Sequence, residues 1–187
     1  MRVPLLYRAY VALSTVLLPF VARSTTKKLR TSGVSAPRAR ERLGRATIDR
    51  TEDTLIWFHA ASVGESLSVL ALITRMGAHL PNAHFLITSG TATSATLIAQ
   101  RMPPRCVHQF APLDAPAPLR RFLKHWRPDA AVFVESELWP QMLRRTQATG
   151  AAMALVNARM SERSLASWAK RPRLAAYLLE VFDLILT

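Results

Sequence analysis

The residues of this chain that could do chemistry lie in short polar segments, each following an apolar run of strand length. In LIWFHAASVGES, residues 55–66, an apolar run leads into small side chains and then to one carboxylate, Glu65, where a helix should begin. A carboxylate placed there can act as a general base toward a hydroxyl nucleophile. It can equally be a helix cap, because Ser62 and Glu65 have the S-x-x-E spacing of a capping box. The segment alone leaves both interpretations open.

Four further polar segments follow later apolar runs. In open α/β folds, ligands bind beyond the carboxyl ends of the strands, so such segments would meet at one edge of the sheet. Carboxylates, a hydroxyl cluster and two arginines would then converge there. The segments are TSGTATS (88–94), APLD (111–114), ESELWP (135–140) and NARMSERS (157–164).

Each of these segments also has a purely structural explanation. Thr91 or Thr93 could cap one helix and Ser161 another. Glu135 and Glu137 precede an expected helix, whose dipole favours anions. Glu135 is nevertheless a strong functional candidate, because it would end a strand buried on both faces, where an unpaired carboxylate is costly.

The elements that must position these segments alternate regularly from residue 54 onward. Helix-length segments lie near 65–79, 92–101, 115–126, 138–148 and 162–180, and they separate six strand candidates. Strict alternation implies right-handed crossovers and an α/β fold, a Rossmann-like parallel sheet with helices on both faces. The predicted strands are 54–60, 84–88, 106–110, 130–135, 151–156 and 182–187.

The first turn does not have the pattern of a dinucleotide site. It contains a lone glycine, Gly64, where that fingerprint needs G-x-G-x-x-G. His59, just before the turn, could reach a ligand, but a histidine satisfied within the core is the simpler interpretation. The single cysteine, Cys106, excludes an intramolecular disulfide and a Cys-rich metal site.

The first fifty residues differ from the rest. Residues 9–22 carry no charge, and nine basic residues lie between positions 23 and 50 against only Glu41 and Asp49. Basic residues beside an apolar segment stay in the cytoplasm and attract anionic lipids. We therefore expect a membrane-anchor helix over 1–23, a basic juxtamembrane linker over 24–50 and the Rossmann-like domain over 51–187. A helix packed on its own domain is the alternative.

The composition favours polyanionic partners. The chain has 25 Lys and Arg against 12 Asp and Glu, a formal charge of +13. Nucleic acid, anionic lipid and phosphorylated substrates all suit such a charge. Because the basic residues cluster beside the apolar segment and are not interleaved with aromatic ones, we expect no nucleic-acid partner.

Four motifs together carry a family resemblance. ASVGES, TSGTATS, ESELWP and NARMSERS, in this order and spacing, resemble the amino-terminal domain of bacterial 3-deoxy-D-manno-octulosonic acid (Kdo) transferases. The resemblance covers essentially the whole chain. It implies half of a two-domain, GT-B-type glycosyltransferase on the cytoplasmic face of the inner membrane. The family transfers Kdo from CMP-Kdo to the bisphosphorylated lipid A precursor in lipopolysaccharide assembly.

Carried over position by position, the resemblance assigns roles to the polar segments. It implies that Glu65 is the general base and that Glu135 stabilises the transition state, with Glu137 as second choice because Glu135 finishes the strand. It implies neither a metal nor a cofactor. The positions that would contact the acceptor sugar and its phosphates are Ser62, Gly64, Ser89, Thr91, Thr93, Asn157, Arg159 and Arg163.

The resemblance also sets a limit on activity. Family members continue into a second domain that holds most of the donor site, whereas this sequence stops at Thr187 within an apolar run. We therefore expect the acceptor-binding half of the enzyme, without transferase activity of its own. The alternative is a membrane-tethered, inactive fragment that binds anionic glycolipid.

Overall fold

The computed structural model describes residues 2–135 and 138–187, and its single sheet confirms the predicted α/β architecture. The strands are β1 (Thr54–His59), β2 (Ala83–Ser89), β3 (Cys106–Phe110), β4 (Ala130–Val134), β5 (Ala152–Val156) and β6 (Leu184–Ile185). The helices between them are α3 (Val63–His79), α4 (Ala92–Gln100), α5 (Pro116–Trp126), α6 (Pro140–Gln147), α7 (Glu162–Ala169) and α8 (Pro172–Leu179).

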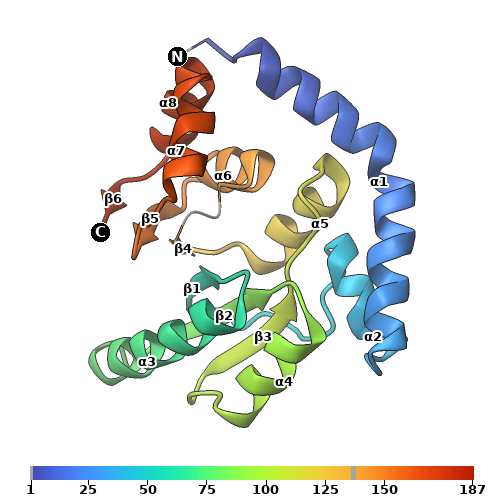
Figure 1. Ribbon diagram of the computed structural model, residues 1–187. Coiled ribbons are helices and arrows are strands. Elements are labelled where there is room, and N and C mark those ends of the chain that lie inside the picture. Colours follow the sequence, from blue (N-terminus) through green and yellow to red (C-terminus); the bar gives the residue numbers. More distant parts are fainter. Residues whose placement is uncertain (1, 136–137) are drawn as a thin grey trace.

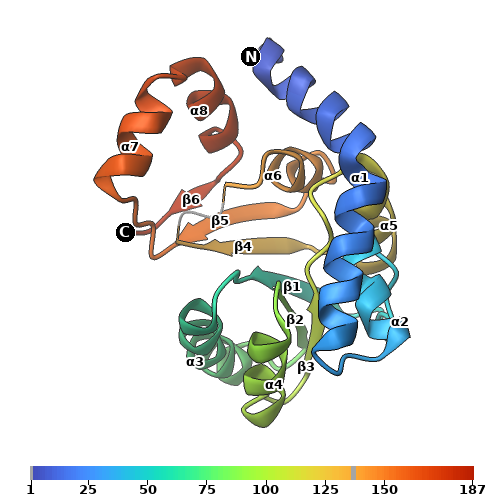
Figure 2. The same cartoon turned by 45° about the vertical axis from the view of Figure 1, so that its right-hand side comes forward.

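All the strand pairs are parallel, and the strand order is β3-β2-β1-β4-β5-β6. Strands β2 and β3 thus lie on one side of β1. The chain then crosses over, so that β4, β5 and β6 lie on the other side of β1. Helices α3 and α4 cover one face of the sheet, while α5 and α6 cover the other (Figures 1 and 2). The reversal between β1 and β4 is the topological switch point, where such folds form a ligand crevice.

Alternate residues of the central strand fill two separate cores. Trp57 and Phe58 are both fully buried, and they point to opposite faces because side chains alternate along a strand. Trp57 packs against Phe122 and Phe133, with ring centroids 4.7 and 5.4 Å apart. Phe58 packs on the other face, in the cluster that includes Phe85. This double burial explains why the strands appear in the sequence as continuous apolar runs.

The last part of the chain differs in detail from the prediction. The single helix expected over 162–180 is two helices, α7 and α8, because Pro172 occupies the first turn of α8 and cannot continue the helix before it. The strand expected over 182–187 is only the two-residue β6.

The amino-terminal helix α1 (Leu5–Thr31) extends well beyond the uncharged run and into the basic residues. It lies along the side of the domain, beside α5 and α2 (Ala36–Ala39), in both views (Figures 1 and 2). Only Leu29 of this helix is buried. By length and composition, with a mean hydropathy of 1.6 in its most apolar window, α1 could cross a membrane.

Residues 24–50, where we expected a linker, pack against the domain. After α1 they form α2 and a 3-10 turn, η1 (Arg40–Leu43). Glu41 is fully buried, and its carboxylate accepts a hydrogen bond from the backbone N–H of Phe110 at 2.8 Å and pairs with Arg38 at 3.4 Å. Arg121 donates to the carbonyl of Leu43 at 2.7 Å. The segment therefore covers the sheet at the β3 edge.

Candidate functional site

The two carboxylates singled out by sequence follow the two strands that flank the switch point. Glu65 comes after β1 and Glu135 after β4, and these strands are paired with His59 opposite Phe133. Because the turns leave adjacent strands at the same edge, both lie at the crevice where open α/β sheets bind ligands.

Glu65 lies in the first turn of α3 and is held by the turn before it. Its Oε2 accepts a hydrogen bond from the backbone N–H of Ala61 at 2.8 Å, and its own N–H donates to Ser62 Oγ at 3.2 Å. The residue keeps only 6% of its surface exposed. Ser62 is therefore the N-cap that the S-x-x-E spacing predicts, although Glu65 reaches back to Ala61 and not to the cap residue itself. Among the described residues, nothing bonds to Glu65 Oε1.

Gly64, the residue before Glu65, leaves the space above the helix start open. It is exposed, and a Cβ added there would meet no heavy atom within 4 Å. Its backbone is helical, so the conformation does not require glycine. A side chain at Gly64 would therefore project into open space at the start of α3.

Glu135 has a strained backbone. Its φ is +56°, in the left-handed region that non-glycine residues rarely adopt, and its N–H donates to Val156 O at 3.0 Å. Asn157, in the same position after the neighbouring strand β5, has a φ of +51°, which asparagine tolerates better. Such strain in a glutamate costs about 1–3 kcal/mol and concentrates at functional sites. The other candidate, Glu137, lies outside the described residues.

The hydroxyl-rich loop after β2 divides into an inner and an outer part. Ser89 is fully buried, and its Oγ lies 2.9 Å from Nε2 of His108. Arg38 donates to Nδ1 of that ring at 2.6 Å, so Nε2 carries the ring proton and Ser89 accepts it. Burial, and then the charge of Arg38, lower the pKa of His108 to about 3. Ser89 thus faces the interior of the domain.

The outer part of this loop and the loop after β5 are exposed. Thr91 is the N-cap of α4, and its Oγ1 accepts a hydrogen bond from Ser94 N at 3.1 Å. Thr93 lies in the first turn of that helix and is exposed. Arg159 and Arg163 are exposed on the fifth loop, and no ion pair involves either one in the described part of the chain. These two guanidinium groups are available to an anionic ligand.

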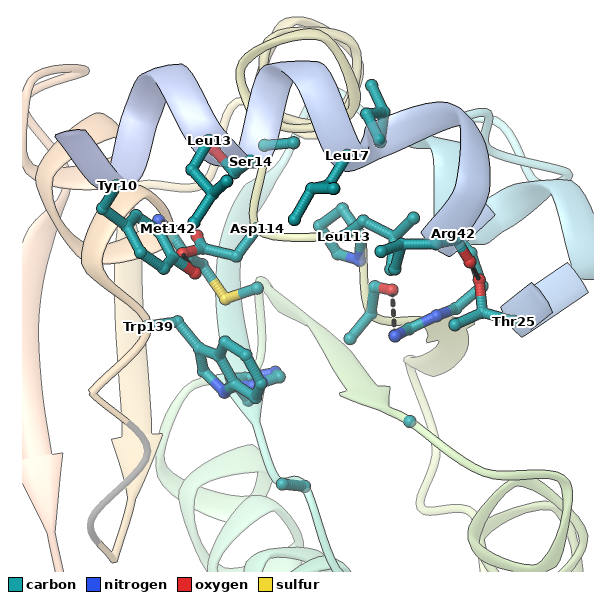
Figure 3. A pocket seen from close by; sticks show the side chains of 18 residues that line it. Tyr10, Leu13, Ser14, Leu17, Thr25, Arg42, Leu113, Asp114, Trp139 and Met142 are labelled. Carbon is teal, nitrogen blue, oxygen red and sulfur yellow. Dashed lines mark hydrogen bonds between the residues drawn. The ribbon is translucent and has the colours of Figure 1, made fainter. Parts of the chain in front are cut away.

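A cavity of about 390 Å³ adjoins this edge and was not foreseen from the sequence (Figure 3). It lies between α1 and the ends of the strands, and its lining includes His59, Ala61, Gly90 and Trp139. The sequence gives no direct signal for it, because its walls come from segments that are far apart along the chain. Within residues 2–135 and 138–187, no cluster of His, Cys, Asp and Glu could hold a metal ion.

A group of hydrogen bonds holds α1 above this cavity. Asp114 Oδ2 accepts a hydrogen bond from the Tyr10 hydroxyl at 2.8 Å, and its Oδ1 accepts from Met142 N at 2.6 Å. Gln141 donates to Ser14 Oγ at 2.7 Å. Burial raises the pKa of Asp114, while its hydrogen bonds from the Tyr10 hydroxyl and the backbone N–H groups of Gln141 and Met142 oppose that shift. Asp114 therefore joins α1 to the start of α6, a structural role that its sequence position did not reveal.

The chain is similar to known proteins along most of its length. Residues 37–187 match the family described as 3-deoxy-D-manno-octulosonic-acid transferase. The transferase of Rickettsia felis is 42% identical over 71% of this chain and 28% of its own length. That of Rickettsia bellii is 38% identical over 88% of this chain and 39% of its own length. A probable mitochondrial transferase of Arabidopsis thaliana is 36% identical over 78% of this chain and 33% of its own length.

The matched regions show how much of each relative this chain covers and which of its segments the family shares. The chain spans between 28% and 39% of the length of these three relatives. Within that span the family match includes the Glu65 turn, the hydroxyl-rich loop and the two arginines of the fifth loop. This chain belongs to the 3-deoxy-D-manno-octulosonic acid transferase family.

Proposed function

We propose that this chain is the acceptor-binding part of a glycosyltransferase that transfers Kdo from CMP-Kdo to the lipid A precursor in lipopolysaccharide core biosynthesis. The observation that carries the proposal is the Glu65 carboxylate at the switch point. One of its oxygens is held by Ala61 N, and the preceding residue, Gly64, is exposed with open space around it. This arrangement suits a general base that must meet a sugar hydroxyl in a fixed orientation.

In the proposed reaction, an acceptor hydroxyl lies against Glu65 Oε1. Its oxygen forms a bond to the anomeric carbon of Kdo while the bond from that carbon to the CMP phosphate breaks. CMP leaves with the bonding electrons, and the hydroxyl proton passes to the carboxylate. The hydrogen bond from Ala61 keeps the carboxylate aimed during the transfer. Glu135, held in its strained conformation beside the same crevice, stabilises the transition state.

The remaining positions divide according to their exposure. Arg159 and Arg163 bind the acceptor phosphates, because a planar guanidinium donates two hydrogen bonds to one phosphate. Ser89 is buried against His108, so its contribution is to position the loop. The polar groups left to contact the acceptor sugar are Ser62, Thr91, Thr93 and Asn157, with Gly64 providing the room.

We further propose that α1 attaches the domain to anionic lipids on the cytoplasmic face of the bacterial inner membrane and lies in the plane of that membrane. Its outward face exposes apolar side chains, including Leu5, Val16 and Phe20. Its opposite face is tied to the domain through Tyr10 and Ser14, near the middle of the apolar run. A helix crossing the bilayer would carry these contacts, and the polar loops behind them, into the hydrocarbon core.

Labelling of an Arg2→Cys variant tests this orientation, because Arg2 is exposed and precedes α1, outside its apolar face. The chain is bound to preformed anionic vesicles from outside, and a membrane-impermeant maleimide is then added. The natural thiol gives little background, because Cys106 is buried and burial raises its pKa to about 12. An in-plane helix leaves the new thiol on the outer surface, where it reacts. Protection until the vesicles are lysed would show that α1 crosses the bilayer.

A second candidate function is glycolipid binding without chemistry. It is favoured by the fraction of its relatives' length that the chain covers, between 28% and 39% in the three comparisons above. We propose that the 187 residues alone bind acceptor in a salt-sensitive way and do not turn it over. An assay of the purified chain with CMP-Kdo and lipid A precursor tests this. Product formed without another protein would refute the proposed inactivity, and binding that does not weaken with salt would refute the phosphate contacts.

A further inference from the structure

A groove lies where the start of α1 meets the start of α8. Both views place these two helix starts near each other (Figures 1 and 2), and the lining comes from two short segments, residues 2–6 and residues 170–174. The volume of the groove, about 840 Å³, lies within the range of about 300–1,000 Å³ typical of small-molecule sites. The groove is therefore large enough to hold a ligand.

The charged side chains of this lining all have the same sign. They are four exposed cations, Arg2, Lys170, Arg171 and Arg173. Among the residues that the structure describes, no carboxylate lines the groove or forms an ion pair with any of the four. Because like charges around one groove repel each other, an anion lying among them is favoured.

Large apolar side chains lie beside these cations. Leu5 is 80% exposed and Leu6 is 52% exposed, while Leu174 of α8 is partly buried. A soluble anion would neutralise the cations and leave these side chains in water. Covering them gains about 25 cal/mol for each Å² of apolar surface removed from water. The lining therefore suits an amphiphile, which brings an anionic group and hydrocarbon together.

The two sides of the groove are already held together. Tyr7 of α1 packs edge-to-face against Tyr177 of α8, with ring centroids 5.2 Å apart. Tyr177 is buried, and the guanidinium of Arg144 lies 3.9 Å from its ring centroid and pairs with Glu180 at 3.1 Å. These contacts fix the start of α1 against α8, so a ligand need not spend binding energy on assembling the groove.

We infer that the groove binds one anionic glycerophospholipid of the membrane. Its headgroup phosphate lies among the cations of residues 170–173, and its acyl chains begin over Leu5 and Leu6. The inference rests on the proposed attachment of α1 to the membrane, and it adds a second contact on a different helix. The cations of α8 then lie at the level of the lipid headgroups.

This second contact sets the orientation of the domain on the membrane. A single helix lying in the membrane surface leaves the domain free to turn about the helix axis. A headgroup held at the start of α8 removes that freedom. The loop with Arg159 and Arg163 leads into α7 and then α8, so the same contact limits its distance from the headgroups. The groove thus presents this loop to the phosphates of an acceptor held in the membrane.

Lys170→Gln combined with Arg173→Gln tests the groove. Neither side chain takes part in a hydrogen bond or ion pair within the described ranges, so folding should not change. Arg75→Gln combined with Arg101→Gln is the matched control. It removes the same two charges from the formal +13, at exposed positions in α3 and at the end of α4. Both helices lie at the opposite end of the domain from the groove (Figures 1 and 2).

Binding to vesicles is measured by co-sedimentation of the purified chain at fixed ionic strength. The vesicles contain phosphatidylcholine with phosphatidylglycerol, or phosphatidylcholine alone. The groove variant should bind the anionic vesicles about thirtyfold more weakly than the parent chain, because each cation near an anionic surface contributes about fivefold. The control should lose less than about threefold, because charges far from the surface are screened. Equal losses in the two variants would overturn the groove as the site.

A dye that is sensitive to its surroundings shows whether the groove itself meets lipid. It is attached to Ala169→Cys, at the exposed end of α7 beside the groove, or to Ala148→Cys, an exposed control position after α6. The natural Cys106 is buried. On anionic vesicles the emission of the dye at position 169 should shift to the blue, and that at position 148 should stay unchanged. Unchanged emission at both positions would contradict the inference.

The remaining outcomes separate this inference from the proposed function. If the parent chain does not bind anionic vesicles, the proposed attachment of α1 is wrong and the groove assignment fails with it. If the groove variant binds them as tightly as the parent chain, only the groove assignment is wrong. Calorimetry with inorganic phosphate supplies the soluble anion: binding by the parent chain that the groove variant loses, with unchanged vesicle binding, would replace the lipid by a soluble anion. Glu65→Gln should bind vesicles like the parent chain, so the catalytic proposal is tested separately.

Discussion

The carboxylate of Glu65 accepts a hydrogen bond from the backbone N–H of Ala61 at 2.8 Å. This contact uses one carboxylate oxygen to close the turn between β1 and α3, and the described residues leave the other oxygen unbonded. Capping and proton transfer are therefore compatible at this glutamate. The helix start supplies the orientation that a general base needs.

Gly64→Ala should distinguish the loss of open space at this turn from a loss of folding stability. Alanine favours a helix over glycine by up to about 1 kcal/mol, and no heavy atom lies within 4 Å of the added Cβ. The variant should therefore unfold at the same denaturant concentration as the parent chain, or at a higher one. Its acceptor binding should nevertheless weaken, because the methyl group fills the open space at this turn. Acceptor affinity equal to that of the parent chain would show that Gly64 has no role in binding.

The alternation of apolar runs and helices was enough to predict the order of the strands along the chain and the edge at which the polar loops meet. Trp57 and Phe58 illustrate why: a strand covered on both faces must be apolar at every position, and such runs are easy to find. The N-caps Ser62, Thr91 and Ser161 also agree with local sequence signals.

The features that sequence reasoning missed depend on contacts between distant segments. Nothing near Asp114 in the sequence indicates that Tyr10 will donate to it, because the two residues are 104 positions apart. The left-handed backbone of Glu135 likewise has no glycine or asparagine to indicate it. The cavity and the packing of residues 24–50 follow from the same kind of long-range contact.

Gly44→Ala should show that the segment before β1 is part of the domain. Gly44 has a φ of +73°, and a Cβ there would lie 2.0 Å from the carbonyl oxygen of Pro118. Gly33→Ala is the matched control, with a φ of +83° and open space around it. The control should lose about 1–2 kcal/mol from backbone strain alone, and Gly44→Ala about 1–3 kcal/mol more from overpacking. Equal losses in urea unfolding would mean that the contact with Pro118 is dispensable.

Two buried histidines should make the protein sensitive to acid. Burial lowers the pKa of both His59 and His108 from 6.5 to about 3 in the folded protein. As the pH falls, these two histidines are therefore protonated in the unfolded chain before they are protonated in the folded one. Their contribution to stability is present above pH 6.5 and declines as the pH falls toward 3. Each can contribute a slope of up to about 1.4 kcal/mol per pH unit. In His108→Gln, urea unfolding across this range should have a shallower slope, and an unchanged slope would contradict the assignment.

The contacts of α1 can be weakened without touching the core. Tyr10→Phe combined with Ser14→Ala removes the hydrogen bonds to Asp114 and Gln141, each worth about 1 kcal/mol. Trypsin should then cut within the basic end of α1 faster than in the parent chain, while the domain unfolds at nearly the same temperature. Thr15→Ala is the control, because its hydroxyl bonds only to Val11 O in the same helix. Equal cleavage rates in all three proteins would show that these bonds do not hold α1.

The role of Glu65 is tested most directly by Glu65→Gln in a chimaera that continues this chain with the part of the Rickettsia bellii transferase that follows its matched segment. Glutamine can still accept from Ala61 N, so the turn and acceptor affinity should be preserved. The rate of Kdo transfer from CMP-Kdo should fall about a hundredfold to ten-thousandfold, the usual contribution of a general base. Glu162→Gln, at an exposed first-turn position of α7, should leave that rate unchanged. Transfer by the Glu65→Gln chimaera at the parent rate would mean that this glutamate is only a helix cap.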